Sequence, residues 1–177
     1  LSSDKGAFKS AFASRRCVIP VDGFYEWHGE KGARVPHWFH PGTEKKAPML
    51  LAGLYHEGEN GFDFAILTTA ANAVVKPVHD RMPVVIKPED FTRWLDCKTQ
   101  EPREVVDLMQ PVQEDFFEAI PVSDNVNKVA NMGPDLQEPV VIENVAEDEV
   151  YCRHHTPAMY GFQSYISMPI SLPDGTF

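Results

Sequence analysis

The chain has 177 residues, a formal net charge of −10 and 43% hydrophobic residues. A chain of this length and composition can bury a sizeable core, so the sequence predicts a globular protein with one main domain. The acidic total excludes a uniformly basic nucleic-acid binder and leaves room for a local basic patch. Four basic residues and no acidic one lie between Lys5 and Arg16.

The cysteine count and the hydropathy pattern bear on the cellular compartment. Three widely spaced cysteines do not resemble a disulfide framework, so we expect reduced thiols in a cytoplasmic protein. No apolar stretch approaches the roughly 20 residues of a membrane span, and no secretory signal is visible at the start of the chain. We therefore expect no membrane partner.

The predicted elements begin with a short amphipathic helix over residues 6–14, where Phe8 and Phe12 are four positions apart. Apolar runs bounded by turn residues then predict strands. Pro20 implies that the first strand is an edge or carries a bulge. The strands are expected over residues 17–22, 24–27, 38–39, 49–55, 62–69, 82–86 and 116–122.

Two helices are expected between the last two of these strands. Pro88 suits the first turn of a helix over "PEDFTRWLD", and "REVVDLMQ" predicts a second one. A polar loop follows over residues 123–135. The sequence thus predicts an α+β domain over residues 1–142, a β-rich curled sheet or partial barrel with a few short helices. Residues 143–177 are expected to form an acidic and then proline-containing tail.

The stretch "DGFYEW" places a carboxylate, Glu26, between Tyr25 and Trp27 directly after an apolar run. Flanking aromatic rings would desolvate the carboxylate and make it a better proton shuttle near neutral pH. The alternative is an ordinary solvated glutamate on the polar side of an edge strand, and the sequence leaves both open.

The stretch "PVHDRMP" indicates a second candidate, His79, because His, Asp and Arg in a row cannot all lie in a core. Such a turn could aim the imidazole, the natural acid–base group at this pH, into a cleft. An exposed polar turn is the alternative. Thr68 ends an apolar strand, where a hydroxyl often lines a cleft, although threonine is also a common strand residue.

Basic and aromatic residues in the same segments suggest nucleic-acid contacts. Arg15, Arg16 and Arg81 could bind phosphates while Trp27 or Trp38 stacks on an unpaired base. Basic residues beside aromatic ones are common, so this pattern is weak when taken alone.

Two other chemistries remain open. His37 and His40, or Cys152 with His154 and His155, offer metal ligands, but neither group has zinc-finger or metalloprotease spacing, and we expect no metal and no cofactor. Cys17 could be the nucleophile of a thiol hydrolase, although a thiol inside an apolar strand is usually inert.

Several motifs occur in a fixed order: "RRCVIPVDGFYEW", "AGLY", "FAILTTAAN", "HDRMPVVI", "WLD" and "VSDNVNKVANMGPDLQEP". This series resembles the SRAP family, named for SOS-response-associated peptidase, whose members include proteins that crosslink to abasic sites in DNA. The resemblance extends from about Phe8 to Pro139. It implies a bacterial or phage protein of the DNA-damage response that joins the nucleoid when DNA is damaged.

The resemblance also implies a mechanism. Family members bind single-stranded DNA, and an N-terminal cysteine condenses its amine and thiol with the aldehyde of the ring-opened abasic sugar to form a thiazolidine. By the same resemblance, Glu26 transfers protons and positions the cysteine amine, and His79 assists ring opening. Thr68 and Arg81 contact the DNA, and Trp27 lines the cleft. Autoproteolytic peptidase activity is also implied.

The family's opening Cys-Gly-Arg and its Asn-Ala-Arg segment have no counterpart in this chain, and Cys17 matches a strand cysteine of the family. Because an open reading frame begins with Met, we expect the native protein to carry an upstream Cys-Gly segment. The alternatives are a non-catalytic single-stranded-DNA binding module and a thiol hydrolase that uses Cys17.

Overall fold

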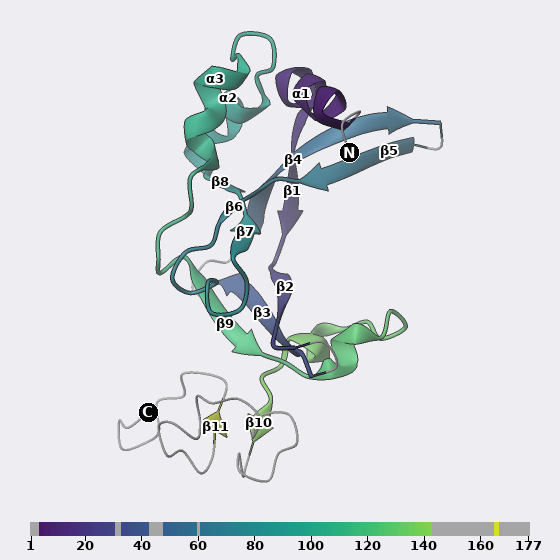
Figure 1. The fold of residues 1–177 in the computed structure, drawn as a ribbon, viewed down its shortest axis with the longest axis vertical. Helices are drawn as coiled ribbons and strands as arrows, with labels where there is room; N and C mark the ends of the chain where they lie inside the picture. Colours follow the sequence, from purple (N-terminus) through teal and green to yellow (C-terminus); the bar gives the residue numbers. More distant parts are fainter. Residues whose placement is uncertain (1–3, 31–32, 43–47, 60, 143–164, 167–177) are drawn as a thin grey trace. The chain divides into compact units, whose positions relative to one another are not determined.

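The computed structural model describes residues 4–30, 33–42, 48–59, 61–142 and 165–166. Within these ranges, short helices accompany antiparallel strand pairs, which confirms the predicted α+β class (Figure 1). The strands of the described residues form four sheets, and none of these sheets closes on itself.

The chain divides into two compact units. The first consists of Leu1–Phe24 and His40–Phe117, and the second of Tyr25–Phe39 and Glu118–Phe177. Apart from residues 165–166, the tail predicted over 143–177 lies outside the described residues. The boundary proposed at residue 142 therefore stays a prediction.

The first unit holds the helices and most of the strands. Its helices are α1 (Asp4–Ser14), α2 (Phe91–Leu95) and α3 (Pro102–Val105). Its strands are β1 (Arg16–Val21), β4 (Met49–Gly58), β5 (Gly61–Ile66), β6 (Thr68–Ala70), β7 (Arg81–Pro83) and β8 (Val85–Ile86). The 3₁₀ turns η1 (Pro88–Asp90) and η2 (Val106–Met109) precede α2 and follow α3.

Strand β4 is the centre of the first unit because it is apolar along most of its length and pairs with three other strands. It lies between β1 and β5, and its first residues also pair with β8. The core packed against this sheet contains Trp94 of α2, which is fully buried, and Phe12 of α1, whose ring centroid lies 6.0 Å from that of Trp94. The helices predicted around Phe12 and Trp94 thus use their aromatic residues to cover the sheet.

The second unit holds most of the three-stranded sheet β2 (Phe24–His28), β3 (Val35–Pro41) and β9 (Phe117–Pro121), in the order β2-β3-β9. Its core is made by Trp38, Ile120 and Val122, with Tyr25 and Val126 packed against them. The 3₁₀ turns η3 (Asp124–Asn127) and η4 (Pro134–Gln137) follow, and β10 (Val141–Ile142) pairs with β11 (Tyr165–Ile166).

Several elements differ from the sequence-based expectation. The strand predicted over residues 62–69 is interrupted at Leu67, and the strand predicted over 82–86 is interrupted at Val84. The two-residue strand predicted at 38–39 extends over Val35–Pro41, and it includes Pro36 and Pro41, residues that usually mark the ends of a strand.

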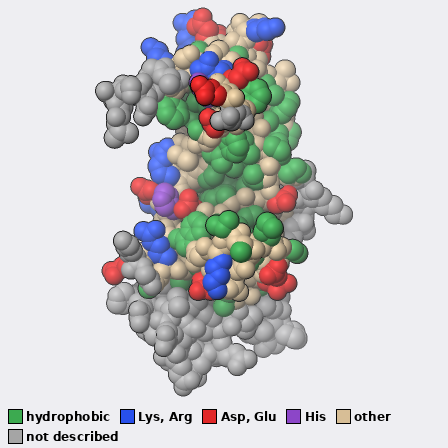
Figure 2. Space-filling view, turned by 90° about the vertical axis from the view of Figure 1, so that its right-hand side faces the viewer, with side chains coloured by type: hydrophobic (Ala, Val, Ile, Leu, Met, Phe, Trp, Pro, Cys, Tyr) green, Lys and Arg blue, Asp and Glu red, His purple; other side chains and the backbone are tan. Residues whose placement is uncertain are grey.

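One strand leaves apolar side chains in contact with solvent. Phe62, Phe64 and Ile66 alternate along β5 and are 68%, 63% and 41% exposed. The β4–β5 hairpin points to the right in Figure 1, and Figure 2 shows this right-hand side face-on. Hydrophobic side chains gather on this face between charged ones. In the described part of the chain, no helix is long and apolar enough to cross a membrane.

Candidate functional site

The candidate site begins at a branch point in the first unit, where three backbone segments share one ring of hydrogen bonds. The N–H of Ala52 donates to the carbonyl of Val84, Val84 donates to Leu67, and Leu67 donates back to Ala52, at 2.8, 2.9 and 2.9 Å. Leu67 separates β5 from β6, and Val84 separates β7 from β8. The two interruptions therefore release β6 and β7 from β4, and these strands pair with each other.

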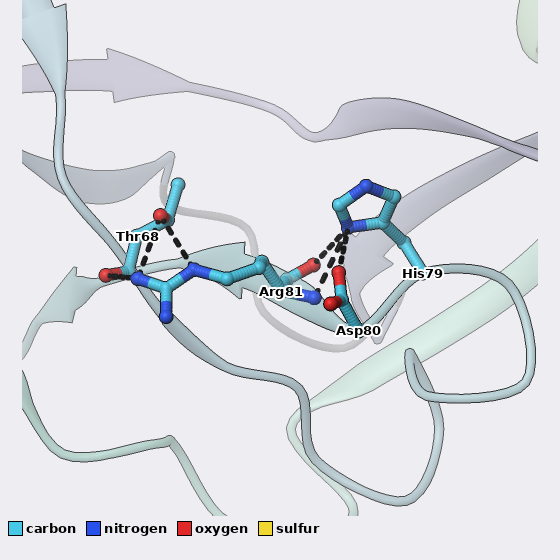
Figure 3. A network of polar contacts seen from close by, with 4 residues as sticks. All are labelled: Thr68, His79, Asp80 and Arg81. Carbon is cyan, nitrogen blue, oxygen red and sulfur yellow. Dashed lines mark hydrogen bonds and ion pairs between the residues drawn. The ribbon is translucent and has the colours of Figure 1, made fainter. Parts of the chain in front are cut away.

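The β6–β7 pair brings Thr68 and Arg81 together. The register pairs Ala70 with Arg81 and Thr68 with Pro83. The Arg81 guanidinium extends along the pair to Thr68, where Nε and Nη2 donate to Oγ1 at 3.0 and 2.9 Å and Nη2 also donates to the carbonyl oxygen (Figure 3). Both side chains are exposed. This places a fixed, solvent-facing cation at the position where the sequence predicts DNA contacts.

His79 lies just before β7, and its ring is held by one nitrogen. Nδ1 is 3.0 Å from both the backbone N–H and the carbonyl oxygen of Arg81 and 3.4 Å from a carboxylate oxygen of Asp80 (Figure 3). A neutral Nδ1 can accept from the Arg81 N–H, and a protonated Nδ1 can donate to the carbonyl or pair with Asp80. Nδ1 therefore has a partner in either protonation state.

The other ring nitrogen of His79, Nε2, makes no hydrogen bond within the described residues and points away from the Asp80–Arg81 contacts (Figure 3). The side chain is 42% exposed. A half-exposed imidazole that is anchored through Nδ1 offers Nε2 for proton transfer to a bound molecule. The structure thus brings three of the predicted site residues, Thr68, His79 and Arg81, onto one hairpin.

Glu26 lies in β2 of the second unit, and its surroundings differ from the predicted ones. Side chains alternate between the two faces of a strand. The rings of Tyr25 and Trp27 are 6.4 Å apart and lie on one face, where Tyr25 also packs on Trp38 at 4.6 Å. Glu26 therefore points to the opposite face, and the expectation that its two aromatic neighbours desolvate it is wrong.

The carboxylate of Glu26 is half-buried and makes no hydrogen bond or ion pair within the described residues. An unpaired carboxylate on a strand is available to a bound group. This availability suits a proton-transfer role that does not depend on desolvation by Tyr25 and Trp27, and it also suits an ordinary strand glutamate.

Trp27 lies on the other face of β2 and is also half-buried. Its indole Nε1 donates to the side-chain oxygen of Asn127 at 2.9 Å. Asn127 ends η3, in the polar segment predicted as a loop over residues 123–135. This hydrogen bond fixes the orientation of the indole plane in the second unit.

The two adjacent arginines of the basic segment have different surroundings. Arg16 is only 3% exposed, and its guanidinium donates to four carbonyl oxygens, those of Trp94 at 2.6 Å, Phe12 at 2.9 Å, and Asp96 and Gln100 at 3.0 Å. It also lies 5.6 Å from the Trp94 ring centroid. Arg16 therefore links β1 to the helices, and carbonyl oxygens already use four of its five N–H donors.

Arg15 is half-buried and lines a pocket of about 220 Å³ between α1 and the β4–β5 hairpin. Its Nη2 is 3.5 Å from the Ser10 hydroxyl, and its Nε is buried without a hydrogen-bond partner among the described residues. The surrounding pocket is lined largely by apolar side chains, including Phe8 and Phe64. Arg15 stays a predicted DNA contact, and it lies far from Thr68 and Arg81 along the sequence.

The alternative chemistries also have positions in the structure. No group of three or more His, Cys, Asp or Glu side chains within the described ranges could hold a metal ion, and Cys152 with its neighbouring histidines lies outside those ranges. Cys17 is half-buried in β1, and burial raises the pKa of its thiol. A raised pKa reduces the thiolate fraction, which does not favour a nucleophile.

Sequence reasoning missed one buried polar residue of this region, Asn72. It is 3% exposed and lies in the segment that joins β6 to β7. The sequence feature that could have found it is an asparagine two residues after a strand. At such a position the asparagine side chain often bonds to the backbone two or three residues further on.

Open antiparallel sheets with short helices define an α+β protein, and comparison with known families identifies its class. The family model described as SOS response associated peptidase (SRAP) matches residues 2–129. This match covers more than half of the chain, and the chain belongs to the SRAP family.

Named relatives agree with the assignment. The chain is 34% identical over 142 residues to the abasic site processing protein YoqW of Bacillus subtilis. This alignment covers 77% of this chain and 62% of YoqW. The chain is also 29% identical over 171 residues to the abasic site processing protein HMCES of Gallus gallus, in an alignment that covers 84% of this chain and 50% of HMCES. The chain thus spans about half to three fifths of the length of these relatives.

Solved structures show the same fold. A protein from Bacteroides thetaiotaomicron superposes with a TM-score of 0.65 at 22% identity, over 75% of this chain and 60% of that chain. A phage-related protein from Bordetella bronchiseptica superposes with a TM-score of 0.53 at 32% identity, over 65% and 56% of the two chains.

Proposed function

We propose that this chain belongs to an abasic-site processing protein that binds single-stranded DNA and joins itself covalently to the abasic sugar. Membership of the SRAP family supports the general activity, because the named relatives are abasic site processing proteins. The observation that carries the proposal is the β6–β7 hairpin. It presents the Arg81 guanidinium, held on Thr68, and the His79 ring, held by the Arg81 backbone with Nε2 free, on one exposed element.

The proposed chemistry is condensation of an aminothiol with an aldehyde. The amine of an N-terminal cysteine, in a segment upstream of Leu1, adds to C1′ of the ring-opened sugar to form a carbinolamine. Loss of water gives an imine, and addition of the thiol sulfur to the same carbon closes the thiazolidine ring. The net reaction consumes one aldehyde and one aminothiol and releases one water, so it needs no oxidant, metal or other cofactor.

Each step of this reaction needs a proton carrier. For His79 we propose that the imidazolium donates its Nε2 proton to the sugar ring oxygen as the ring opens, while its Nδ1–H donates to the carbonyl oxygen of Arg81. For Glu26 we propose that the unpaired carboxylate takes a proton from the cysteine ammonium and returns one to the carbinolamine oxygen. The proposed peptidase activity would free the cysteine amine by removing the residue before it.

The DNA contacts follow from charge. Arg81 would bind a backbone phosphate, Thr68 would orient its guanidinium, and Trp27 would stack on an unpaired base. Arg15 is kept as a further phosphate contact. Arg16 is left out, because its guanidinium is buried and carbonyl oxygens use four of its five donors.

The test is a denaturing gel of the protein with its native N-terminus after incubation with a single-stranded oligonucleotide that carries one abasic site. We expect a heat-stable shifted band that forms at least about a hundredfold more slowly in His79→Ala and Glu26→Gln. His56→Ala and Glu57→Gln, at exposed positions of β4, are the matched controls.

Absence of any covalent band would overturn the crosslinking proposal. If salt-sensitive binding to the same oligonucleotide remained, the result would favour the second candidate, a non-catalytic single-stranded-DNA binding module. The Arg81–Thr68 pair favours this second candidate as much as it favours the first.

A further inference from the structure

Asn72 is the buried polar side chain of the loop that carries His79, and both ends of its amide are used. Oδ1 accepts the backbone N–H of Val75 at 3.1 Å, and Nδ2 donates to the carbonyl oxygen of Gln113 at 3.1 Å. Because one end accepts and the other donates, only one orientation of the amide satisfies both contacts.

The first contact shapes the turn that leads to His79. The carbonyl of Asn72 accepts the N–H of Lys76 at 2.9 Å, and the carbonyl of Val75 accepts the N–H groups of Val78 and His79 at 2.9 and 3.0 Å. Val75 is fully buried, so the centre of this turn is anchored in the core. The backbone of His79 is thus bonded to the residue that Asn72 caps.

The second contact ties the turn to a different segment of the same unit. A second hydrogen bond lies next to the Nδ2 bond to Gln113: the backbone N–H of Ala73 donates to the carboxylate of Glu114. The backbone N–H of Asn72 itself lies 3.4 Å from the sulfur of Met82 in β7. Asn72 therefore connects the turn to Gln113 and to β7, and Ala73 adds a contact with Glu114.

We propose that Asn72 is a positioning residue that fixes the backbone of the 72–80 loop and thereby keeps His79 Nδ1 on the backbone of Arg81, whose N–H and carbonyl oxygen both lie 3.0 Å away. This inference rests on the proposed function for its catalytic consequence. Without the Asn72 contacts, the turn would lose its link to Gln113, and the Nδ1 bond that orients the free Nε2 would open more often. A displacement of about 1 Å at a reacting group can cost about a hundredfold in rate.

Two variants with opposite charge changes test the proposal. Asn72→Asp keeps the acceptor, replaces the Nδ2 donor by an oxygen that faces the Gln113 carbonyl, and adds a negative charge. Glu114→Ala removes the acceptor of the Ala73 N–H and also removes a negative charge. A purely electrostatic effect on His79 would therefore have opposite signs in the two variants, whereas loss of positioning has the same sign in both.

The readout is hydrogen exchange of the Arg81 amide, the donor to Nδ1, followed by NMR alongside the crosslinking rate. We expect Arg81 exchange at least about tenfold faster in both variants, and crosslinking about tenfold to a hundredfold slower. Gln110→Glu, at an exposed position of the same unit, adds the same charge as Asn72→Asp and should leave both quantities unchanged. Glu114 is exposed, so its variant should fold even if Asn72→Asp does not.

The outcomes separate this proposal from the proposed function. Unchanged Arg81 exchange in the folded variants would overturn the positioning role. Faster exchange with an unchanged crosslinking rate would also overturn it. If the native protein formed no crosslink at all, the proposed function would fail, while faster Arg81 exchange in both variants would still support the Asn72 contact as the support of His79.

Discussion

The Arg81 guanidinium is fixed on Thr68 by hydrogen bonds from Nε and Nη2 to one hydroxyl oxygen, at 3.0 and 2.9 Å. A guanidinium carries five N–H donors. The Thr68 contacts use only part of them, and Nη1 has no hydrogen-bond partner in the described ranges of the chain. The pair is thus a preoriented donor on an exposed hairpin, which lowers the entropy lost when a phosphate binds.

Substitution of either residue should weaken DNA binding in a characteristic way. We expect Arg81→Ala to reduce affinity for single-stranded DNA of any sequence and to lower the slope of log K against log salt by about one. Thr68→Val, which keeps the charge and removes the hydroxyl, should reduce affinity by only a few fold and leave the slope unchanged. Fluorescence anisotropy at several salt concentrations measures both quantities.

Arg103→Ala is the matched control for this experiment, because Arg103 is 80% exposed and, among the described residues, forms its ion pair with Glu101 at 3.1 Å. An equal loss of slope in Arg81→Ala and Arg103→Ala would show that Arg81 contributes only general charge. An unchanged slope in Arg81→Ala would contradict a direct phosphate contact.

Arg16 should matter for stability. Its buried guanidinium satisfies four carbonyl oxygens that come from α1 and from the segment around α2. Lysine has fewer donors and cannot reach them in the same plane, so Arg16→Lys should lower the free energy of unfolding by about 2–4 kcal/mol. Urea denaturation measures this loss. Arg103→Lys should change stability by less than about 0.5 kcal/mol, and a comparable value for Arg16→Lys would contradict the structural role.

Cys17 should behave as a packed thiol. Burial raises its pKa above the ordinary value, so its alkylation near neutral pH should be slower than that of a free cysteine and should accelerate only at more alkaline pH. Mass spectrometry of iodoacetamide-treated protein in a Cys97→Ser, Cys152→Ser background follows this one thiol. Rapid alkylation at pH 7 would revive the thiol-hydrolase alternative.

The same pKa shift has a consequence for folding. The unfolded thiol loses its proton near pH 8.5, whereas the folded thiol keeps it to higher pH. The unfolded state therefore binds fewer protons in this window, and the free energy of unfolding should fall as the pH rises above about 8.5. The Cys17→Ala variant should show a smaller decline, measured by urea denaturation between pH 7.5 and 10 in the same background.

A side chain at Gly53 should destabilise the protein. It pairs with Cys17 across β1 and β4, and a Cβ atom there would lie 2.6 Å from Ile19 Cδ1 and 2.9 Å from Cys17 Sγ. We expect Gly53→Ala to lower the free energy of unfolding by about 1–3 kcal/mol through overpacking. Gly58→Ala, at the other end of β4, meets its nearest atom at 3.3 Å and should cost less. Equal losses in a denaturation experiment would contradict the contact.

Local sequence pattern predicted most elements and the family. Apolar runs bounded by turn residues indicated β1, β2, β4 and β9 to within a few residues, and Pro88 marked the turn before α2. These features depend on neighbours along the chain, so the sequence contains them directly. The order of "DGFYEW" and "HDRMP" indicated the SRAP family, which the family match then confirmed.

The faces of β2 could have been read from the sequence and were not. Strict alternation along a strand places Tyr25 and Trp27 together and Glu26 opposite them. The expectation of a carboxylate between two rings treated neighbours in sequence as neighbours in space. The ring contacts of Tyr25 with Trp27 and Trp38 show that these rings share one face of the strand. The prediction failed because it did not apply the alternation of side chains along a strand.

Other features were decided only by tertiary structure. Nothing near Arg16 in the sequence distinguishes it from Arg15, because three of its four carbonyl partners lie 78 to 84 residues further along the chain. The interruptions at Leu67 and Val84 likewise have no local signal, since both residues are apolar and suit a continuous strand. Both interruptions exist because β5 and β8 pair with successive parts of the same edge of β4. The hydrogen bonds among Ala52, Leu67 and Val84 mark the point where β5 ends its pairing with β4 and β8 begins it. The sequence alone therefore determined which residues could do chemistry, and long-range backbone pairing decided that Thr68, His79 and Arg81 lie on one hairpin.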